Sequence, residues 1–276
     1  HHLLRAGRAE EASQAMLAAA MWSWRRAERA QRERRLEELI AWTAPPARGE
    51  QAPALHARGL AELAHHHGEG GDFAAANATL ERARDAVQRA AGERGFDSCA
   101  AWAAFREGQV MRLQGRVSEG ATLSAAGIAH AHRAGEVEVE ALCFAQVGLD
   151  AYRSGDFGGA RAAYDEGITL MRRAVNRATE AQNSMMKSAT EAPHAMEALS
   201  RAAVALAREV GALRTELVAR HIWIEALYRV GQRDLARQQG LELSALAQRR
   251  GVGGRHGSHP GARDAGGGRR RARARP

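Results

Sequence analysis

The feature that most constrains this chain is a short turn that recurs at a nearly constant spacing. At Gly155-Asp156-Phe157 the turn is followed by Ala160, and then by Tyr164 four residues later. Apart from the first interval, successive turns lie about forty residues apart, a period typical of helical-repeat proteins. The turns that share this arrangement, of which the one at Thr190 is the weakest, begin at Gly7, Gly71, Gly115, Gly155, Thr190 and Gly231.

This spacing has a simple physical meaning. A glycine in the turn permits the left-handed backbone that ends one helix, and an aspartate after it can cap the next helix. A small residue on the second helix lets the two helices approach closely, and a larger one four residues later lies on the same face and fills the next gap. One such hairpin cannot bury its apolar face alone, whereas stacked copies can. Because the strong helix formers Ala, Leu, Arg and Glu dominate the composition, we expect an all-α protein.

Breaks in the helical pattern divide the chain into four parts. Residues 1–43 read as the second half of an incomplete repeat and a long amphipathic helix at about residues 9–42, which predicts a segment cut from a longer chain. Three prolines make residues 44–53 a linker, because proline blocks helix continuation. Residues 54–248 contain the five turns of a predicted solenoid, and residues 249–276 form a tail without apolar periodicity.

The basic character of the chain is confined to this tail. The formal net charge is +8, and the nine arginines and single acid (Asp264) of residues 249–276 supply all of it. The tail is rich in glycine and cannot bury enough apolar surface to fold, so we expect it to be disordered. Two interpretations stay open, an inert extension of the kind that a GC-rich gene encodes in a shifted frame, and an arm that binds nucleic acid or an acidic surface.

The segment ALCFAQVGLDAYRSGDFGGARAAYDEGI, at residues 141–168, resembles a tetratricopeptide repeat. Gly148 stands in the place of the glycine of the usual Leu-Gly pair, Tyr152 is the aromatic of the first helix, and Ala160 and Tyr164 are the small and aromatic residues of the second. This resemblance implies a right-handed α-solenoid of antiparallel hairpins. It also implies a place in a larger bacterial regulator, such as the repeat region of a signalling ATPase, a protein kinase or a LuxR-type protein.

Motifs that carry chemistry are missing from the sequence. Neither a phosphate-binding G-x-x-x-x-G-K-[ST] loop nor a G-x-S-x-G elbow occurs. His65, His66 and His67 are consecutive, and neighbours on a helix point about 100° apart, so they cannot face one metal ion. Cys99 and Cys143 lie in apolar helical stretches, which predicts buried free thiols. We therefore expect no enzyme, no cofactor and no metal site.

The remaining function is binding. No apolar run approaches the ~18 residues of a membrane span, and no signal peptide is present, so we expect a cytoplasmic protein without a membrane partner. The first helices of stacked hairpins line a concave surface, which predicts a groove for a protein or peptide. The alternative is a nucleic-acid-binding accessory protein that acts through its tail. The residues predicted to line the groove are Arg58, His65, Trp102, Phe105, Gln109, Arg112, Tyr152, Arg153, His221, Glu225, Tyr228 and Arg229.

Overall fold

The computed structural model describes residues 9–26, 28–45 and 52–249. Within these ranges the chain forms twelve α-helices and no β-strand. No helix among the described residues is both long and apolar enough to cross a membrane. The helices are α2 (Ala9–Arg25), α3 (Arg29–Thr43), α4 (Ala52–Glu69), α5 (Phe73–Arg89), α6 (Phe96–Leu113), α7 (Val117–Ala134), α8 (Val137–Arg153), α9 (Phe157–Arg173), α10 (Arg177–Ser188), α11 (Pro193–Glu209), α12 (Leu213–Arg229) and α13 (Arg233–Arg249).

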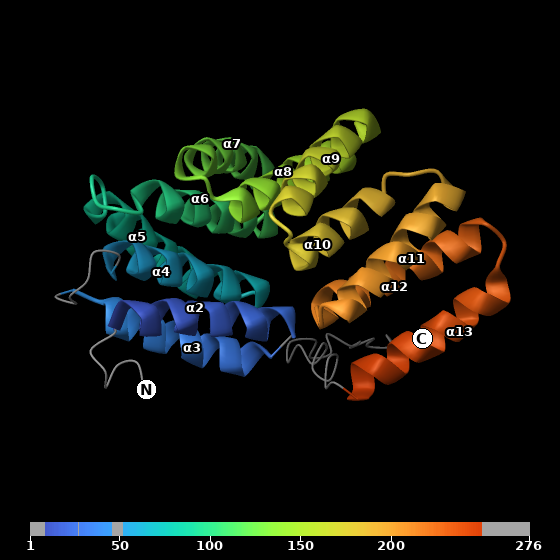
Figure 1. Cartoon of the computed structure of the whole chain (residues 1–276), viewed down its shortest axis with the longest axis horizontal. Helices are drawn as coiled ribbons and strands as arrows, with labels where there is room; N and C mark the ends of the chain where they lie inside the picture. The colour runs from blue at the N-terminus through green and yellow to red at the C-terminus, as the bar shows by residue number, and fades with distance from the viewer. Residues whose placement is uncertain (1–8, 27, 46–51, 250–276) are drawn as a thin grey trace, which may run out of the picture.

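The helices pack in chain order as antiparallel hairpins, and each hairpin stacks on the next (Figure 1). The stack curves into an arc that runs from α2 and α3 to α12 and α13 (Figure 1). The arc curls far enough for α12 to contact α2. This arrangement confirms the prediction of an all-α solenoid built from helical hairpins.

The predicted glycine turns are confirmed as hairpin turns. Gly155, between α8 and α9, has a φ of +84°, and Gly71, between α4 and α5, has a φ of +81°. An L-residue with a side chain rarely adopts this left-handed backbone, which explains the glycines. The next residue caps the following helix: the amide of Gly159 donates to Asp156 Oδ1 at 2.8 Å, and the amide of Ala75 donates to Asp72 Oδ1 at 2.9 Å.

Small residues at the predicted positions let the paired helices approach closely. Ala160 is fully buried, and the ring of Tyr164 lies against the backbone of Gly148 on the preceding helix. A Cβ atom placed on Gly148 would lie 2.6 Å from Tyr164 Cε1. In the preceding hairpin Gly108 faces Gly120, and a Cβ on Gly120 would lie 2.9 Å from the Gly108 carbonyl oxygen.

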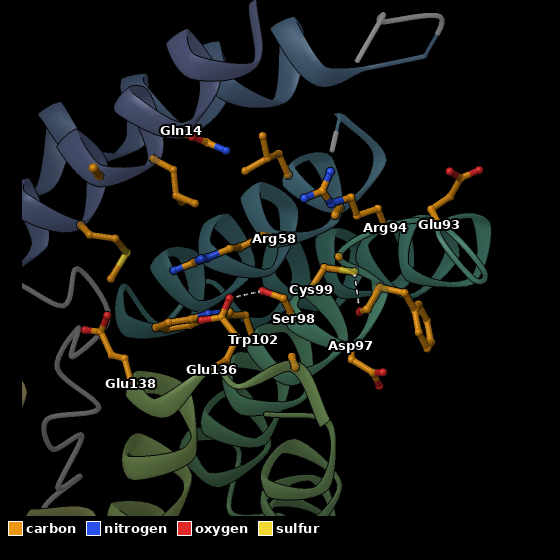
Figure 2. A pocket seen from close by; sticks show the side chains of 18 of the residues that line it. Gln14, Arg58, Glu93, Arg94, Asp97, Ser98, Cys99, Trp102, Glu136 and Glu138 are labelled. Atoms are coloured by element: carbon orange, nitrogen blue, oxygen red, sulfur yellow. Dashed lines mark hydrogen bonds between the residues drawn. The ribbon is translucent and has the colours of Figure 1, made fainter. Parts of the chain in front are cut away.

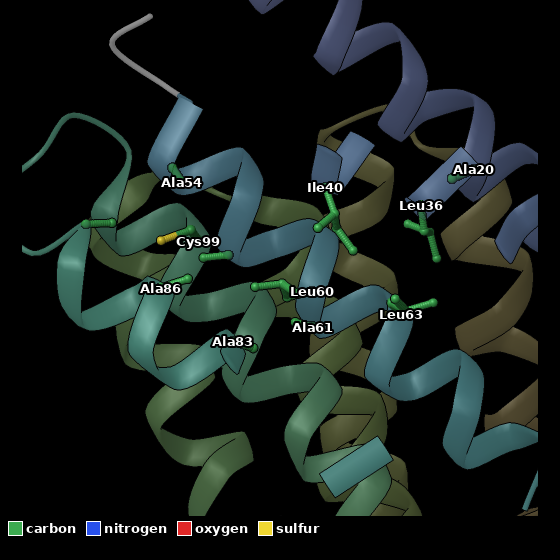
Figure 3. Packing of buried hydrophobic residues seen from close by; sticks show 12 residues of the cluster. Ala20, Leu36, Ile40, Ala54, Leu60, Ala61, Leu63, Ala83, Ala86 and Cys99 are labelled. Atoms are coloured by element: carbon green, nitrogen blue, oxygen red, sulfur yellow. The ribbon is translucent and has the colours of Figure 1, made fainter. Parts of the chain in front are cut away.

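The largest core cluster joins the first three hairpins and is built mostly from alanine (Figure 3). Leu36 and Ile40 of α3 meet Leu60 of α4, with Ala83 of α5 and Cys99 of α6 in the same cluster. Alanine side chains are short, so the hairpins come close together and the chain needs few aromatic residues to fill its core.

The prediction of one long helix at about residues 9–42 is wrong. The chain reverses after α2, and α2 packs against α3 as an antiparallel hairpin. This hairpin buries the apolar faces of both helices, because Leu17 shares a cluster with Leu39, and Ala20 with Leu36. No glycine or proline marks the reversal, where the Glu28 amide donates to the Ser23 carbonyl oxygen at 2.9 Å and Ser23 Oγ donates to Glu28 Oε2 at 3.3 Å. The predicted turn at Gly7 lies outside the described residues.

The predicted register of the fourth turn of the solenoid is wrong by one residue. The spacing after Thr190 predicts that Ala195 and Leu199 face inward. Instead Met196 and Ser200 are buried, whereas Ala195 is exposed and Leu199 is only partly buried. The connection at residues 189–192 contains one residue more than the connection between α6 and α7, and the extra residue shifts the inward face of α11.

Two of the predicted segments fall mainly outside the described residues. The structure does not describe residues 46–51 of the predicted linker or residues 250–276 of the predicted tail. The last two residues of the predicted linker belong to α4, which begins at Ala52. Pro53 therefore lies in the first helical turn, where proline removes no intrahelical hydrogen bond.

Candidate binding site in the concave groove

One cavity of about 690 Å³ follows the inner face of the arc, and we refer to it as the concave groove. The first helices of five successive hairpins, α4, α6, α8, α10 and α12, all contribute to its wall. The groove is lined by Ser23, Trp24, Glu28, Arg29, Arg32, His65, His66, Glu69, Gln109, Arg112, Leu113, Gln146, Leu149, Arg153, Gln182, Met185, Met186, Arg214, Thr215 and Val218.

Four of the residues proposed from the sequence line this groove together. They are His65, Gln109, Arg112 and Arg153. Arg112 is largely buried, and its Nε donates to Asp150 Oδ1 at 2.9 Å. Tyr152 lies outside the groove with its ring edge against Phe157 at 5.6 Å between centroids, whereas the neighbouring Arg153 reaches the wall.

Trp102 and Phe105 are packing residues, and the prediction that they line the concave groove is wrong. Only 2% of Trp102 and 1% of Phe105 is exposed, and both belong to a core cluster with Val139, Leu142 and other residues of α6 to α8. The guanidinium of Arg58 lies 3.9 Å from the centre of the Trp102 ring. Arg58 and Trp102 line a second cavity on the other side of α2 and do not line the concave groove.

The four residues proposed from α12 lie away from the concave groove. His221, Glu225, Tyr228 and Arg229 are exposed, and Arg229 Nη2 lies 2.5 Å from Glu225 Oε1. Because the arc curls inward at its end, α12 reaches the groove with its first turns, through Arg214, Thr215 and Val218. The register inferred from the earlier hairpins therefore does not transfer to the last one.

A buried charged cluster behind the groove was not foreseen from the sequence. Glu62 is fully buried between two arginines, with Oε2 at 2.9 Å from Arg32 Nη2 and Oε1 at 2.8 Å from Arg106 Nε. Burial alone would raise the pKa of Glu62, but Arg106 and Arg32 together more than offset it and the pKa is lowered. The only sequence signal was an acid inside the apolar run Leu60-Ala-Glu-Leu-Ala.

Glu69 joins the two ends of the arc at the groove. Its Oε2 lies 3.0 Å from Arg32 Nη1, and its Oε1 lies 2.6 Å from Arg214 Nη2 of α12. Trp24 Nε1 of α2 also donates to Glu69 Oε1 at 3.4 Å. The Trp24 ring lies 5.0 Å from the guanidinium carbon of Arg214 and 5.5 Å from that of Arg106, distances at which a cation is attracted to the ring face.

The open part of the groove combines apolar and cationic side chains. Leu113 is 47% exposed and Val218 is 44% exposed, on helices from opposite parts of the arc. The guanidiniums of Arg29 and Arg153 pair with no carboxylate in the described part of the chain, and Arg29 Nη2 donates instead to the backbone oxygen of His66 at 3.0 Å. The groove therefore offers positive charge and apolar surface to a ligand.

The buried His66 makes the stability of the protein depend on pH. Burial lowers its pKa from 6.5 to about 4, with further lowering by the Arg29 and Arg32 guanidiniums, and Glu33 opposes the shift. As the pH falls below 6.5, His66 of the unfolded chain takes up a proton while His66 of the folded chain does not. The contribution of the neutral His66 to the free energy of unfolding is therefore complete above pH 6.5 and is lost as the pH falls toward about 4.

Between about pH 7 and about pH 5 we expect the wild-type free energy of unfolding to fall by about 1–2 kcal/mol more than that of His66→Gln. Urea denaturation at both pH values measures the difference. His194→Gln at an exposed position serves as the control and should follow the wild type. Equal pH dependence in the wild type and His66→Gln would contradict the assignment to His66.

The two cysteines are buried free thiols, as predicted. Burial raises the pKa of Cys99 to about 11 and that of Cys143 to about 12, so both stay protonated at neutral pH. Among the described residues, no group of three His, Cys, Asp or Glu side chains is arranged to hold a metal ion.

No protein-family model matches the sequence, and no curated protein matches it. Among solved structures, the crystal structure of BtubC (BKLC) from P. vanneervenii is similar, with a TM-score of 0.59 and 14% sequence identity. The similarity covers 89% of this chain and 96% of that chain. At this identity the likeness shows a shared fold.

Proposed function

We propose that this chain is a non-catalytic, tetratricopeptide-like scaffold that binds an acidic peptide segment with apolar side chains in its concave groove. The observation that carries the proposal is the continuous wall formed by the first helices of five successive hairpins. We further propose that the chain is the interaction region of a larger bacterial regulatory protein, as the resemblance of residues 141–168 to a tetratricopeptide repeat implies.

The chemistry of the ligand follows from charges that the protein leaves uncompensated. Glu62 and Glu69 are already paired with arginines, whereas Arg29 and Arg153 have no carboxylate partner among the described residues. A carboxylate on the ligand can form charge-assisted hydrogen bonds with such a guanidinium. The exposed Leu113 and Val218 side chains provide apolar surface that a ligand can bury.

Fluorescence polarisation with two labelled peptide libraries tests this proposal. Both libraries carry the same apolar residues, with glutamate at the polar positions of one and lysine at those of the other. We expect the wild type to bind members of the glutamate library and to bind the lysine library much more weakly. Arg153→Gln should weaken binding about tenfold, because a hydrogen bond to a charged group contributes about 1.5–3 kcal/mol.

Arg173→Gln, at an exposed position on α9 that does not line the groove, is the matched control and should bind as the wild type does. Leu113→Asp should also weaken binding, because it replaces apolar surface with a charge that repels the ligand. Equal binding of the two libraries, no binding of either, or wild-type affinity in Arg153→Gln would each refute the proposal.

A further inference from the structure

A second cavity, of about 920 Å³, lies between α2 and the N-terminal ends of α4, α6 and α8, and we refer to it as the α2 pocket (Figure 2). None of the residues that line it also lines the concave groove. Trp102 also lines a small neighbouring cavity, together with Trp24, Phe105 and Arg106. The α2 pocket is therefore a separate candidate site, and its volume is within the range of small-molecule sites.

Arg58 gives the α2 pocket an unpaired positive charge. Its guanidinium lies over the Trp102 ring, 3.9 Å from the ring centre (Figure 2). Arg58 pairs with no carboxylate in the described part of the chain, and its Nε is buried without a hydrogen-bond partner. Trp102 is only 2% exposed, and its Nε1 is also buried without a hydrogen-bond partner. Unsatisfied buried donors are uncommon in folded proteins, and two of them at one cavity point to a ligand.

Glu136 gives the same pocket a negative charge. Its carboxylate accepts a hydrogen bond from Ser98 Oγ at 2.5 Å, and none of the described cations forms an ion pair with it. Glu138, the neighbouring acid of the wall, is instead paired with Arg25 at 3.1 Å. Figure 2 shows Arg58, Ser98 and Glu136 around the same part of the pocket. Burial lowers the pKa of Arg58 and the nearby charges of Glu62 and Glu136 oppose that shift, but no ion pair joins Arg58 to Glu136.

The rest of the wall mixes apolar side chains with charged ones such as Glu93, Arg94 and Asp97. The apolar part of the wall includes Leu17 and Met21 of α2 and Leu55 of α4. A ligand that fits this lining carries one negative group, one positive group and an apolar side chain. We propose that the α2 pocket binds a free α-amino acid with an apolar side chain, with its carboxylate on Arg58 and its ammonium group on Glu136.

Isothermal titration calorimetry of the full chain with each standard L-α-amino acid, one at a time, tests this assignment. We expect binding of at least one amino acid with an aliphatic or aromatic side chain. The N-acetyl derivative lacks the ammonium group and the amide derivative lacks the carboxylate, so each should bind about tenfold more weakly or worse. These comparisons use the wild-type protein and do not depend on the folding of any variant.

Two variants assign the charges to residues. Arg58→Met keeps an apolar stem over Trp102 but removes the guanidinium, and Glu136→Gln keeps an acceptor for Ser98 but removes the charge. Each should weaken amino-acid binding about tenfold or more, while Arg153→Met in the concave groove should leave it unchanged. The proposal is overturned if no amino acid binds, if the acetylated and amidated forms bind as well as the free form, or if Arg58→Met and Glu136→Gln bind as the wild type does. Peptide binding in the groove uses other residues, so the two proposals can fail separately.

Discussion

Replacing Glu62 by alanine is expected to lower the free energy of unfolding by about 3–5 kcal/mol, because it removes the carboxylate from a fully buried ion-pair cluster. Arg106 would then remain buried without a carboxylate partner, and Arg32 would keep Glu69 alone; each arginine is only 1% exposed. Urea denaturation followed by far-UV circular dichroism measures the change.

Two further variants separate the charge from the packing at this position. Glu62→Gln keeps nearly the same shape, so it should show most of the loss if charge is the cause. Glu225→Ala removes an exposed carboxylate that pairs with Arg229, and it should cost less than about 1 kcal/mol. A loss in Glu62→Ala no larger than that in Glu225→Ala would contradict a structural role for the buried cluster.

Gly148→Ala is expected to destabilise the protein by about 2–3 kcal/mol, although alanine is the better helix former. The new Cβ would lie within 2.9 Å of three ring atoms of Tyr164. That ring is 1% exposed and packs against Ala145 and Ala160, so it has little room to move. The helices α8 and α9 would have to separate, and thermal or urea denaturation would detect the loss.

Gly240→Ala in α13 is the matched control. A Cβ at Gly240 would meet no atom within 4 Å, so the helix-propensity gain alone should stabilise the protein by up to about 1 kcal/mol. In a Tyr164→Leu background the cost of Gly148→Ala should shrink, because the clashing ring is gone. Destabilisation of equal size in Gly148→Ala and Gly240→Ala would show that close helix approach is not the cause.

The hairpin architecture could be predicted because its determinants are local. Gly155 sets the backbone of a turn, Asp156 caps the following helix, and Ala160 permits close packing, all within a few residues. The reversal between α2 and α3 could not be predicted in this way. It depends on the contact of Leu17 with Leu39, and no turn-forming residue marks it.

The concave groove was predictable only in part, for a related reason. Repeat register identifies the first helices that line the groove, so Gln109 and Arg153 could be found. Whether an aromatic residue such as Trp102 is open or buried depends on how the neighbouring hairpins stack, which sequence spacing does not specify. Trp24 and Arg214 were missed because the curl of the arc brings them together from opposite ends of the chain.

The contact between Glu69 of α4 and Arg214 of α12 closes this solenoid across its concave side. In an open array of repeats each unit interacts with its neighbours alone, so the two ends behave independently. Here residues 145 positions apart in the chain meet at 2.6 Å, and both line the concave groove. A ligand that contacted both residues would therefore bind with an affinity that depends on whether the contact between Glu69 and Arg214 is formed.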